Sequence, residues 1–134
     1  MKKITALAIA LLLVISLSAC RTDPVGKYVT VSVNGKTPFD NLKDGGNAAD
    51  ALLLVEAMGL TQDEFNKRLF TVELYTDGTV RIESILGMGG AGTWTMNGST
   101  VTAVVGSETY VFTLNGKKLS GKVGAADFVL EKQQ

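Results

Sequence analysis

The sequence predicts a mainly β protein: an antiparallel up-and-down barrel of about eight strands, with a helical insert between strands 1 and 2. Three observations support this prediction. Turn sequences recur about every eight to ten residues, apolar and polar residues alternate between the turns, and one segment lacks that alternation and is rich in alanine and leucine. Consecutive hairpins favour closure into a barrel, because closure removes the exposed strand edges that promote aggregation.

Residues 1–19 have the order of a bacterial export signal. Two lysines follow the first methionine, an apolar run ends at Leu17, and small residues precede Cys20. The run is shorter than the roughly 20 residues that a membrane-spanning helix needs. We therefore expect residues 1–19 to be a cleaved lipoprotein signal peptide, residues 20–26 a lipidated cysteine and short tether, and residues 27–134 a single barrel domain.

Leu17-Ser18-Ala19-Cys20 resembles the lipobox, where bacterial enzymes attach diacylglycerol to a cysteine and then cleave before it. Cys20 is the one cysteine of the chain, and the resemblance implies that it is lipidated. The alternative, ordinary signal cleavage, would leave a free thiol in an oxidising compartment. Several acyl chains would make attachment permanent. The expected location is extracytoplasmic, on the bacterial cell membrane, or on the outer membrane of a cell with two.

Two-residue loops that favour positive φ separate most of the predicted strands. These turns are Asn34–Gly35, Asp77–Gly78, Asn97–Gly98, Gly106–Ser107 and Asn115–Gly116. Looser connections lie at Gly87–Gly92 and near Gly124. The predicted strands are Lys27–Val33, Leu69–Thr76, Thr79–Leu86, Gly92–Met96, Ser99–Val105, Glu108–Leu114, Lys117–Val123 and Ala126–Lys132.

Alternation within the strands indicates which side chains point inward. In the first strand these are Val29, Val31 and Val33. The large aromatic residues predicted to point inward are Phe70, Trp94, Tyr110, Phe112 and Phe128. These five are the candidate lining of a site for a small apolar ligand. In a fully packed barrel, small residues such as Ala103 and Gly121 would instead make room for large neighbours.

The segment Asn47–Met58 predicts a helix that ends at Gly59. Its apolar residues form one broad face, which we expect to close one end of the barrel. That face contains Ala48, Ala51, Leu52, Leu54, Val55 and Met58. Leu53 lies on the opposite face, either as a lone exposed residue or as a contact for a membrane, ligand or partner. Thr61–Glu64 has the form of a capping box, so a second short helix is expected.

Several sequence motifs carry a family resemblance over nearly the whole mature chain. They are Gly26-Lys27-Tyr28, Glu56–Thr61, Leu74–Thr79, Gly92-Thr93-Trp94 and Phe128–Lys132. With the meander and the insert, they resemble the calycin group of lipocalins and fatty-acid-binding proteins. More closely, the chain resembles small lipocalin-like lipoproteins of anaerobic gut-type bacteria, a largely uncharacterised family. The lipocalin opening Gly-x-Trp stands here as Gly26-Lys27-Tyr28. The resemblance implies a barrel and, by analogy alone, an apolar ligand.

The residue types present exclude several kinds of chemistry. The chain has no histidine, which excludes Ser-His-Asp catalysis and histidine-based zinc sites. Asp40, Asp44 and Asp50 lack the spacing of a calcium loop, so capping and solubility explain them better. The glycine-rich segment Gly87–Gly92 leads into a strand, which favours a flexible connection or a gate over a phosphate-binding loop. We expect no catalytic residues, metal or cofactor.

The charge pattern limits the partners. The 13 basic and 13 acidic residues are interspersed, which argues against nucleic acid. The membrane, through lipid on Cys20, is the expected contact, and the sequence indicates no particular protein partner. Two functions remain open: an anchored module that binds a small apolar ligand in its barrel, or a structural or protein-interaction module of the cell envelope with a packed core.

Overall fold

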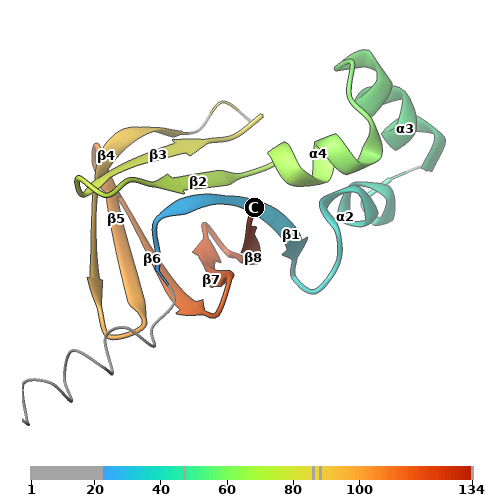
Figure 1. Ribbon diagram of the computed structural model, residues 1–134. Coiled ribbons are helices and arrows are strands. Elements are labelled where there is room, and N and C mark those ends of the chain that lie inside the picture. Colours follow the sequence, from blue (N-terminus) through green and yellow to red (C-terminus); the bar gives the residue numbers. More distant parts are fainter. Residues whose placement is uncertain (1–22, 47, 86, 88, 134) are drawn as a thin grey trace, which may run out of the picture.

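A computed structural model of the chain describes residues 23–133 apart from residues 47, 86 and 88. Eight strands form one closed antiparallel barrel in chain order, and β8 pairs with β1 to close it (Figure 1). The strands are β1 (Gly26–Val33), β2 (Thr71–Leu74), β3 (Thr79–Glu83), β4 (Gly89–Asn97), β5 (Thr100–Val105), β6 (Glu108–Asn115), β7 (Lys118–Val123) and β8 (Ala126–Lys132). The predicted fold class is confirmed. The predicted signal peptide and Cys20 lie outside the described residues.

The two ends of the barrel differ in what they carry. β1 begins at the same end as the turns that follow β2, β4 and β6, as the pairing of Gly26 with Leu74 shows. We call this the turn end. β1 finishes at the opposite end, where the chain leaves the barrel after Val33 and returns at Thr71. We call that the insert end, because the helices lie beyond it (Figure 1).

A β-bulge in β1 changes which of its side chains face inward. The pairing with β8 shifts register just after Thr30. Tyr28 and Thr30 are buried, whereas Val31 is 39% exposed, and Val29 lines a groove on the outside of the barrel. The predicted inward direction of Val29 and Val31 is therefore wrong, and Val33 alone joins the barrel core. One extra residue reverses the faces of a strand.

The glycine-rich segment differs from its prediction as well. β4 starts at Gly89, and Gly89–Gly92 pairs with Val80–Glu83 in β3. A Cβ atom added at Gly92 would collide with the carbonyl oxygen of Val104 in β5. Glycine is required here because the neighbouring backbone approaches closely. Residues Gly89–Gly92 therefore belong to the sheet. The prediction of a flexible connection or gate over Gly87–Gly92 is wrong for these four residues.

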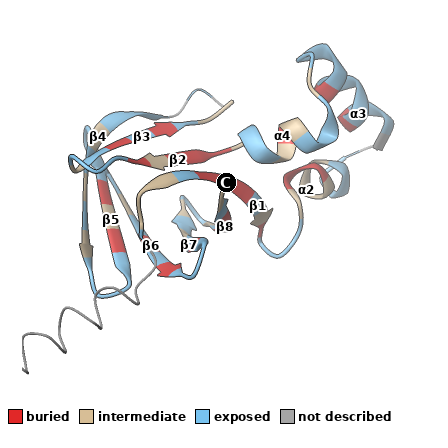
Figure 2. Ribbon diagram, in the orientation of Figure 1, coloured by how far each residue is buried: buried red, intermediate tan, exposed pale blue. Residues whose placement is uncertain are grey.

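The barrel interior contains a continuous hydrophobic core to which every strand except β4 contributes fully buried side chains (Figure 2). Its buried members are Tyr28, Val33, Phe70, Val72, Leu74, Val80, Ile82, Val101, Ala103, Phe112, Leu114, Leu119, Phe128 and Leu130. From β2 onward these are the residues that alternation predicted. The alternating pattern therefore identifies the inner face wherever a strand has no bulge.

The insert contains three helices, one more than predicted. They are α2 (Pro38–Asp44), α3 (Ala48–Ala57) and α4 (Gln62–Arg68). Thr37 caps α2 by accepting a hydrogen bond from the backbone N–H of Asp40, and Pro38 occupies the first turn. The predicted capping box of α4 is present. Within the described ranges, no helix has the length and apolar character to cross a membrane.

The helices form their own small hydrophobic cluster and do not close the barrel. Phe39 from α2, Ala51 and Val55 from α3, and Phe65 from α4 are buried against one another. Figure 1 shows the insert projecting from the barrel, with α3 farthest from the strands. The predicted plug is therefore wrong. Helix α3 packs against Phe39 of α2 and Phe65 of α4, and not against the barrel interior as predicted.

Candidate functional site

Four of the five predicted ligand-lining residues meet inside the barrel. The ring centroids of Phe70 and Phe128 are 5.6 Å apart, and those of Phe70 and Tyr110 are 5.7 Å apart. Tyr110 stacks on Phe112 with centroids 6.4 Å apart. These separations lie in the range of favourable aromatic contacts. The four rings therefore form one cluster that reaches the insert end, where Phe70 leads into β2.

Trp94, the fifth predicted residue, lies apart from this cluster. Its indole Nε1–H donates a hydrogen bond of 2.9 Å to the carbonyl oxygen of Tyr75. Tyr75 belongs to the connection between β2 and β3, so this hydrogen bond joins Trp94 of β4 to that connection at the turn end of the barrel. Trp94 packs against the same barrel core as the other four residues, but it takes no part in the ring contacts that join them.

Most of the aromatic cluster is shielded from solvent. Phe70, Phe112 and Phe128 are buried, and Tyr110 is half-buried at the insert end. Burial raises the pKa of the Tyr110 hydroxyl, and nearby Glu108 raises it further. The phenol therefore stays neutral at physiological pH. The rings pack against one another, so these side chains occupy the space between them.

Small residues accommodate the rings. Gly121 in β7 pairs with Phe112 on one side and with Phe128 on the other. A Cβ atom added at Gly121 would lie 2.8 Å from Cδ1 of the Phe112 ring. Ala103 is fully buried opposite Trp94. This is the arrangement predicted for a fully packed barrel.

We expect Gly121→Val to destabilise the protein by about 1 to 3 kcal/mol, because its side chain would collide with the backbone carbonyl oxygen of Val111 and push the Phe112 ring out of position. Urea denaturation followed by circular dichroism measures this change. Ser120→Val is the matched control, since Ser120 is exposed on the outer face of the same strand. Equal stability of the two variants would show that the barrel has free space beside Gly121.

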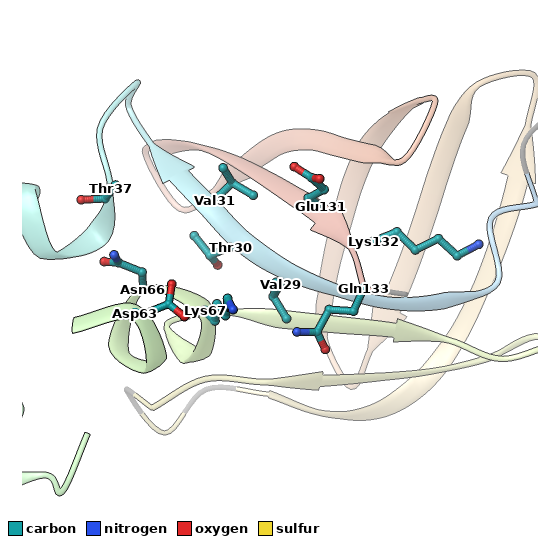
Figure 3. Close-up of a pocket in the computed structure, with 10 residues that line it drawn as sticks. All are labelled: Val29, Thr30, Val31, Thr37, Asp63, Asn66, Lys67, Glu131, Lys132 and Gln133. Carbon is teal, nitrogen blue, oxygen red and sulfur yellow. Dashed lines mark ion pairs between the residues drawn. The ribbon is translucent and has the colours of Figure 1, made fainter. Parts of the chain in front are cut away.

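A groove of about 380 Å³ lies outside the barrel, between α4 and strands β1 and β8 (Figure 3). Val29 and Val31 form its apolar part, and Asn66 lies on its helical side. Asp63 and Lys67 at its edge pair with each other at 3.0 Å. No sequence pattern predicts this groove, because it arises from the bulge in β1. Its charged groups neutralise each other, and its shape favours no particular ligand.

Four exposed apolar side chains lie close together on and just after α3, spread over more than one side of the helix. Leu53 is 62% exposed, and its neighbours Leu52, Leu54 and Met58 are 40–46% exposed. We call these four residues the α3 apolar surface. Helical periodicity predicts that Leu53 alone is exposed and that the other three lie on a buried face. An exposed group of this kind is typical of a contact site.

The aspartates of the insert form ordinary surface ion pairs. Asp44 pairs with Lys36 at 2.5 Å, and Asp40 pairs with Lys43 at 3.5 Å. Lys36 lowers the pKa of Asp44 by hydrogen bonding and by charge. Over the described part of the chain, no group of three or more acidic, cysteine or histidine residues is positioned to hold a metal ion.

Comparison with known proteins adds a structural relative. The chain is similar to the crystal structure of a DUF4847 family protein from Bacteroides vulgatus ATCC 8482, with a TM-score of 0.50 and 14% sequence identity. The similarity covers 81% of this chain and 94% of that chain. At this identity it shows the fold alone. No family profile matches the chain, and no curated protein matches it.

The start of the domain is held against the turn end. The Tyr28 hydroxyl donates a hydrogen bond of 2.7 Å to the carbonyl oxygen of Pro24. The Lys132 Nζ group donates one of 2.8 Å to the carbonyl oxygen of Asp23. Much of the segment predicted as a tether is therefore fixed to the barrel. Burial, and secondarily the charge of Asp23, raises the pKa of Tyr28 to about 12.

We expect stability to fall between about pH 10 and pH 12, on the order of 2 kcal/mol. In this range the unfolded chain loses the Tyr28 proton, near the ordinary tyrosine pKa of about 10, while the folded chain keeps it. The stabilisation by the neutral Tyr28 hydroxyl is thus complete below about pH 10, and it is lost as the pH rises through the pKa of Tyr28 in the folded protein. Thermal unfolding across this range should show a smaller decline in Tyr28→Phe. Tyr75→Phe is the comparison: a hydrogen bond to Glu73 raises the pKa of Tyr75 too, but Tyr75 is exposed, so we expect a smaller change than for Tyr28→Phe. Identical declines in all three proteins would contradict the assignment.

Proposed function

We propose that this protein is a lipid-anchored module of the bacterial cell envelope whose packed barrel supports a helical surface for contact with another protein. One observation carries the proposal: the barrel interior is filled by its own side chains, while the α3 apolar surface is open to solvent. A scaffold needs a rigid core and an accessible contact surface. Binding in the interior would instead require space between the rings of Phe70, Tyr110 and Phe112.

Anchoring is the second part of the proposal. It rests on the lipobox-like Leu17-Ser18-Ala19-Cys20 and on the apolar run before it. Lipid on Cys20 would place the domain outside the cytoplasm and hold it at a membrane surface. The contacts of Asp23 and Pro24 with the barrel support this part, because they leave little chain between the lipid and the domain.

Binding of a small apolar ligand is the second candidate function. The observation that favours it is the half-buried Tyr110 at the insert end, with Val105 and Val123 partly buried near it. A ligand entering there would have to displace Tyr110 from Phe70. The lipocalin-like architecture supports this candidate by analogy alone.

Native mass spectrometry of the purified protein distinguishes the two candidates. We expect no co-purifying apolar molecule beyond the lipid on Cys20, and no saturable binding of an apolar fluorescent dye. The physical reason is that the four rings already occupy the interior. Saturable dye binding that Phe112→Trp abolishes would overturn the packed-core proposal and favour the ligand. Thr113→Trp, on the exposed outer face of the same strand, controls for nonspecific effects of the added ring.

A further inference from the structure

We infer that the barrel stands on the membrane with its turn end toward the lipid, and that the insert projects away from the bilayer. This inference deepens the proposed function and rests on lipidation of Cys20. It assigns the α3 apolar surface to a protein partner, because it places that surface on the side of the domain remote from the lipid.

The first argument is the fixed start of the chain. Asp23 is held by Lys132, and Pro24 is held by Tyr28, a fully buried residue of the barrel core. The backbone N–H of Val25 also donates a hydrogen bond of 3.0 Å to Oδ1 of Asp23. Between the lipid and this fixed point lie Cys20, Arg21 and Thr22, which span roughly 10 Å at full extension. The lipid must therefore enter the bilayer close to the turn end.

The second argument is the direction of β1. The strand starts beside this fixed point and has 8 residues, so it spans roughly 25 Å at about 3.3 Å per residue. The insert begins only after its far end (Figure 1). Helix α4 returns beside β1, where Lys67 shares a groove with Val29 and Lys132, but α3 lies beyond the far end of the strand and is farther from the point of anchoring than the free chain can reach.

The third argument is the distribution of charge. Lys117 and Lys118 lie where the turn after β6 leads into β7, and both are exposed. Lys132 lies beside them, because its backbone N–H donates a hydrogen bond to the carbonyl oxygen of Lys117. The insert, residues 34–70, carries more carboxylates than cationic side chains. An anionic phospholipid surface attracts basic groups and repels acidic ones. The turn end also carries the acidic Asp77 and Glu131, so charge supports the orientation less strongly than the fixed start does.

Site-specific labelling of the complete lipoprotein tests the orientation. Acylation blocks the thiol of Cys20, so Lys117→Cys and Leu53→Cys each present one reactive thiol for a fluorophore. The labelled proteins are reconstituted in vesicles of phosphatidylethanolamine and phosphatidylglycerol that contain a spin-labelled headgroup quencher. We expect several-fold stronger quenching at position 117 than at position 53. Equal quenching, or stronger quenching at position 53, would overturn the inference and indicate that the α3 apolar surface lies on the lipid.

A double variant, Tyr28→Phe with Lys132→Met, tests the cause. It removes both side-chain donors that hold Asp23 and Pro24, and circular dichroism verifies that the barrel remains folded. We expect the difference in quenching between positions 117 and 53 to shrink by at least half. An undiminished difference would overturn the role of the fixed start.

Failure of the underlying proposal has a different signature. A Cys20 that carries no lipid would itself react with the fluorophore in the unsubstituted protein, and the protein would not float with the vesicles. A lipidated protein that floats but shows no difference between the two positions contradicts the orientation alone.

Discussion

Replacement of Cys20 by serine should move the protein almost completely from the detergent phase to the aqueous phase after temperature-induced detergent separation. Wild type should enter the detergent phase, because acyl chains contribute about 0.8 kcal/mol per buried CH₂ group. The described helices contain no membrane-spanning segment that would replace the lipid. Intact-mass measurement should show the added diacylglycerol and acyl chain in wild type alone.

The same mass measurement supplies the control. A serine variant that keeps residues 1–19 would still carry an apolar run, so the partition must be read on the cleaved protein. Ser18→Ala keeps Cys20 and should behave as wild type. If the cleaved serine variant and wild type partition alike, and wild type carries no added mass, the lipid anchor does not exist.

Phe112→Ala should destabilise the barrel by about 3 to 5 kcal/mol, the range for loss of a fully buried phenylalanine. Phe112 is 0% exposed and lies beside Gly121, where no Cβ atom is present to fill the space. The neighbouring ring of Tyr110 would lose its stacking partner. Urea denaturation should show a lower midpoint with an unchanged slope.

Val111→Ala is the matched comparison, because Val111 is the adjacent residue of β6 and is 52% exposed. Its loss should change stability by less than about 1 kcal/mol. If the Phe112 variant were as stable as the Val111 variant, the interior around the rings would not be closely packed. That result would also strengthen the case for an apolar ligand.

The sequence determines the barrel because turns and alternation are local signals. Gly98 and Gly116 provide the positive φ that two-residue hairpins require. Because Asn97 pairs with Thr100 and Asn115 with Lys118, each loop lies one residue later than the predicted Asn-Gly turn. Alternation between such turns then fixes the inner face of each strand, as at Val101 and Phe112. Pairing of β1 with β8 follows from closure rather than from any one motif. The fold class could therefore be predicted without knowledge of long-range contacts.

The errors arose where distant contacts override local patterns. In β1, valine alternation continues through the bulge after Thr30, and the bulge is visible only in the pairing with β8. Helix α2 was overlooked although Thr37 and Pro38 form a recognisable helix start. Helix α3 is apolar on several sides, so periodicity could not show which face would be buried. The partner residues Phe39 and Phe65 decide that face.

The candidate site was predicted only in part. Alternation placed the aromatic rings inside, and four of them meet there. Trp94 packs against the same core, but its hydrogen bond to the connection between β2 and β3 depends on register, which single strands do not reveal. The α3 apolar surface could not be predicted, since a run of leucines fits a buried helix as well as an exposed one.

The separation of the helical cluster from the barrel core divides the molecule into two hydrophobic units. Phe65 and Val55 contribute to the packing of the helices, whereas Phe112 and Leu130 contribute to that of the barrel. Among the described residues, none is a buried member of both groups. Substitutions in one of these two hydrophobic clusters therefore leave the packing of the other largely intact. A change in the helical insert can therefore alter the surface that it presents while the packing of the barrel stays the same.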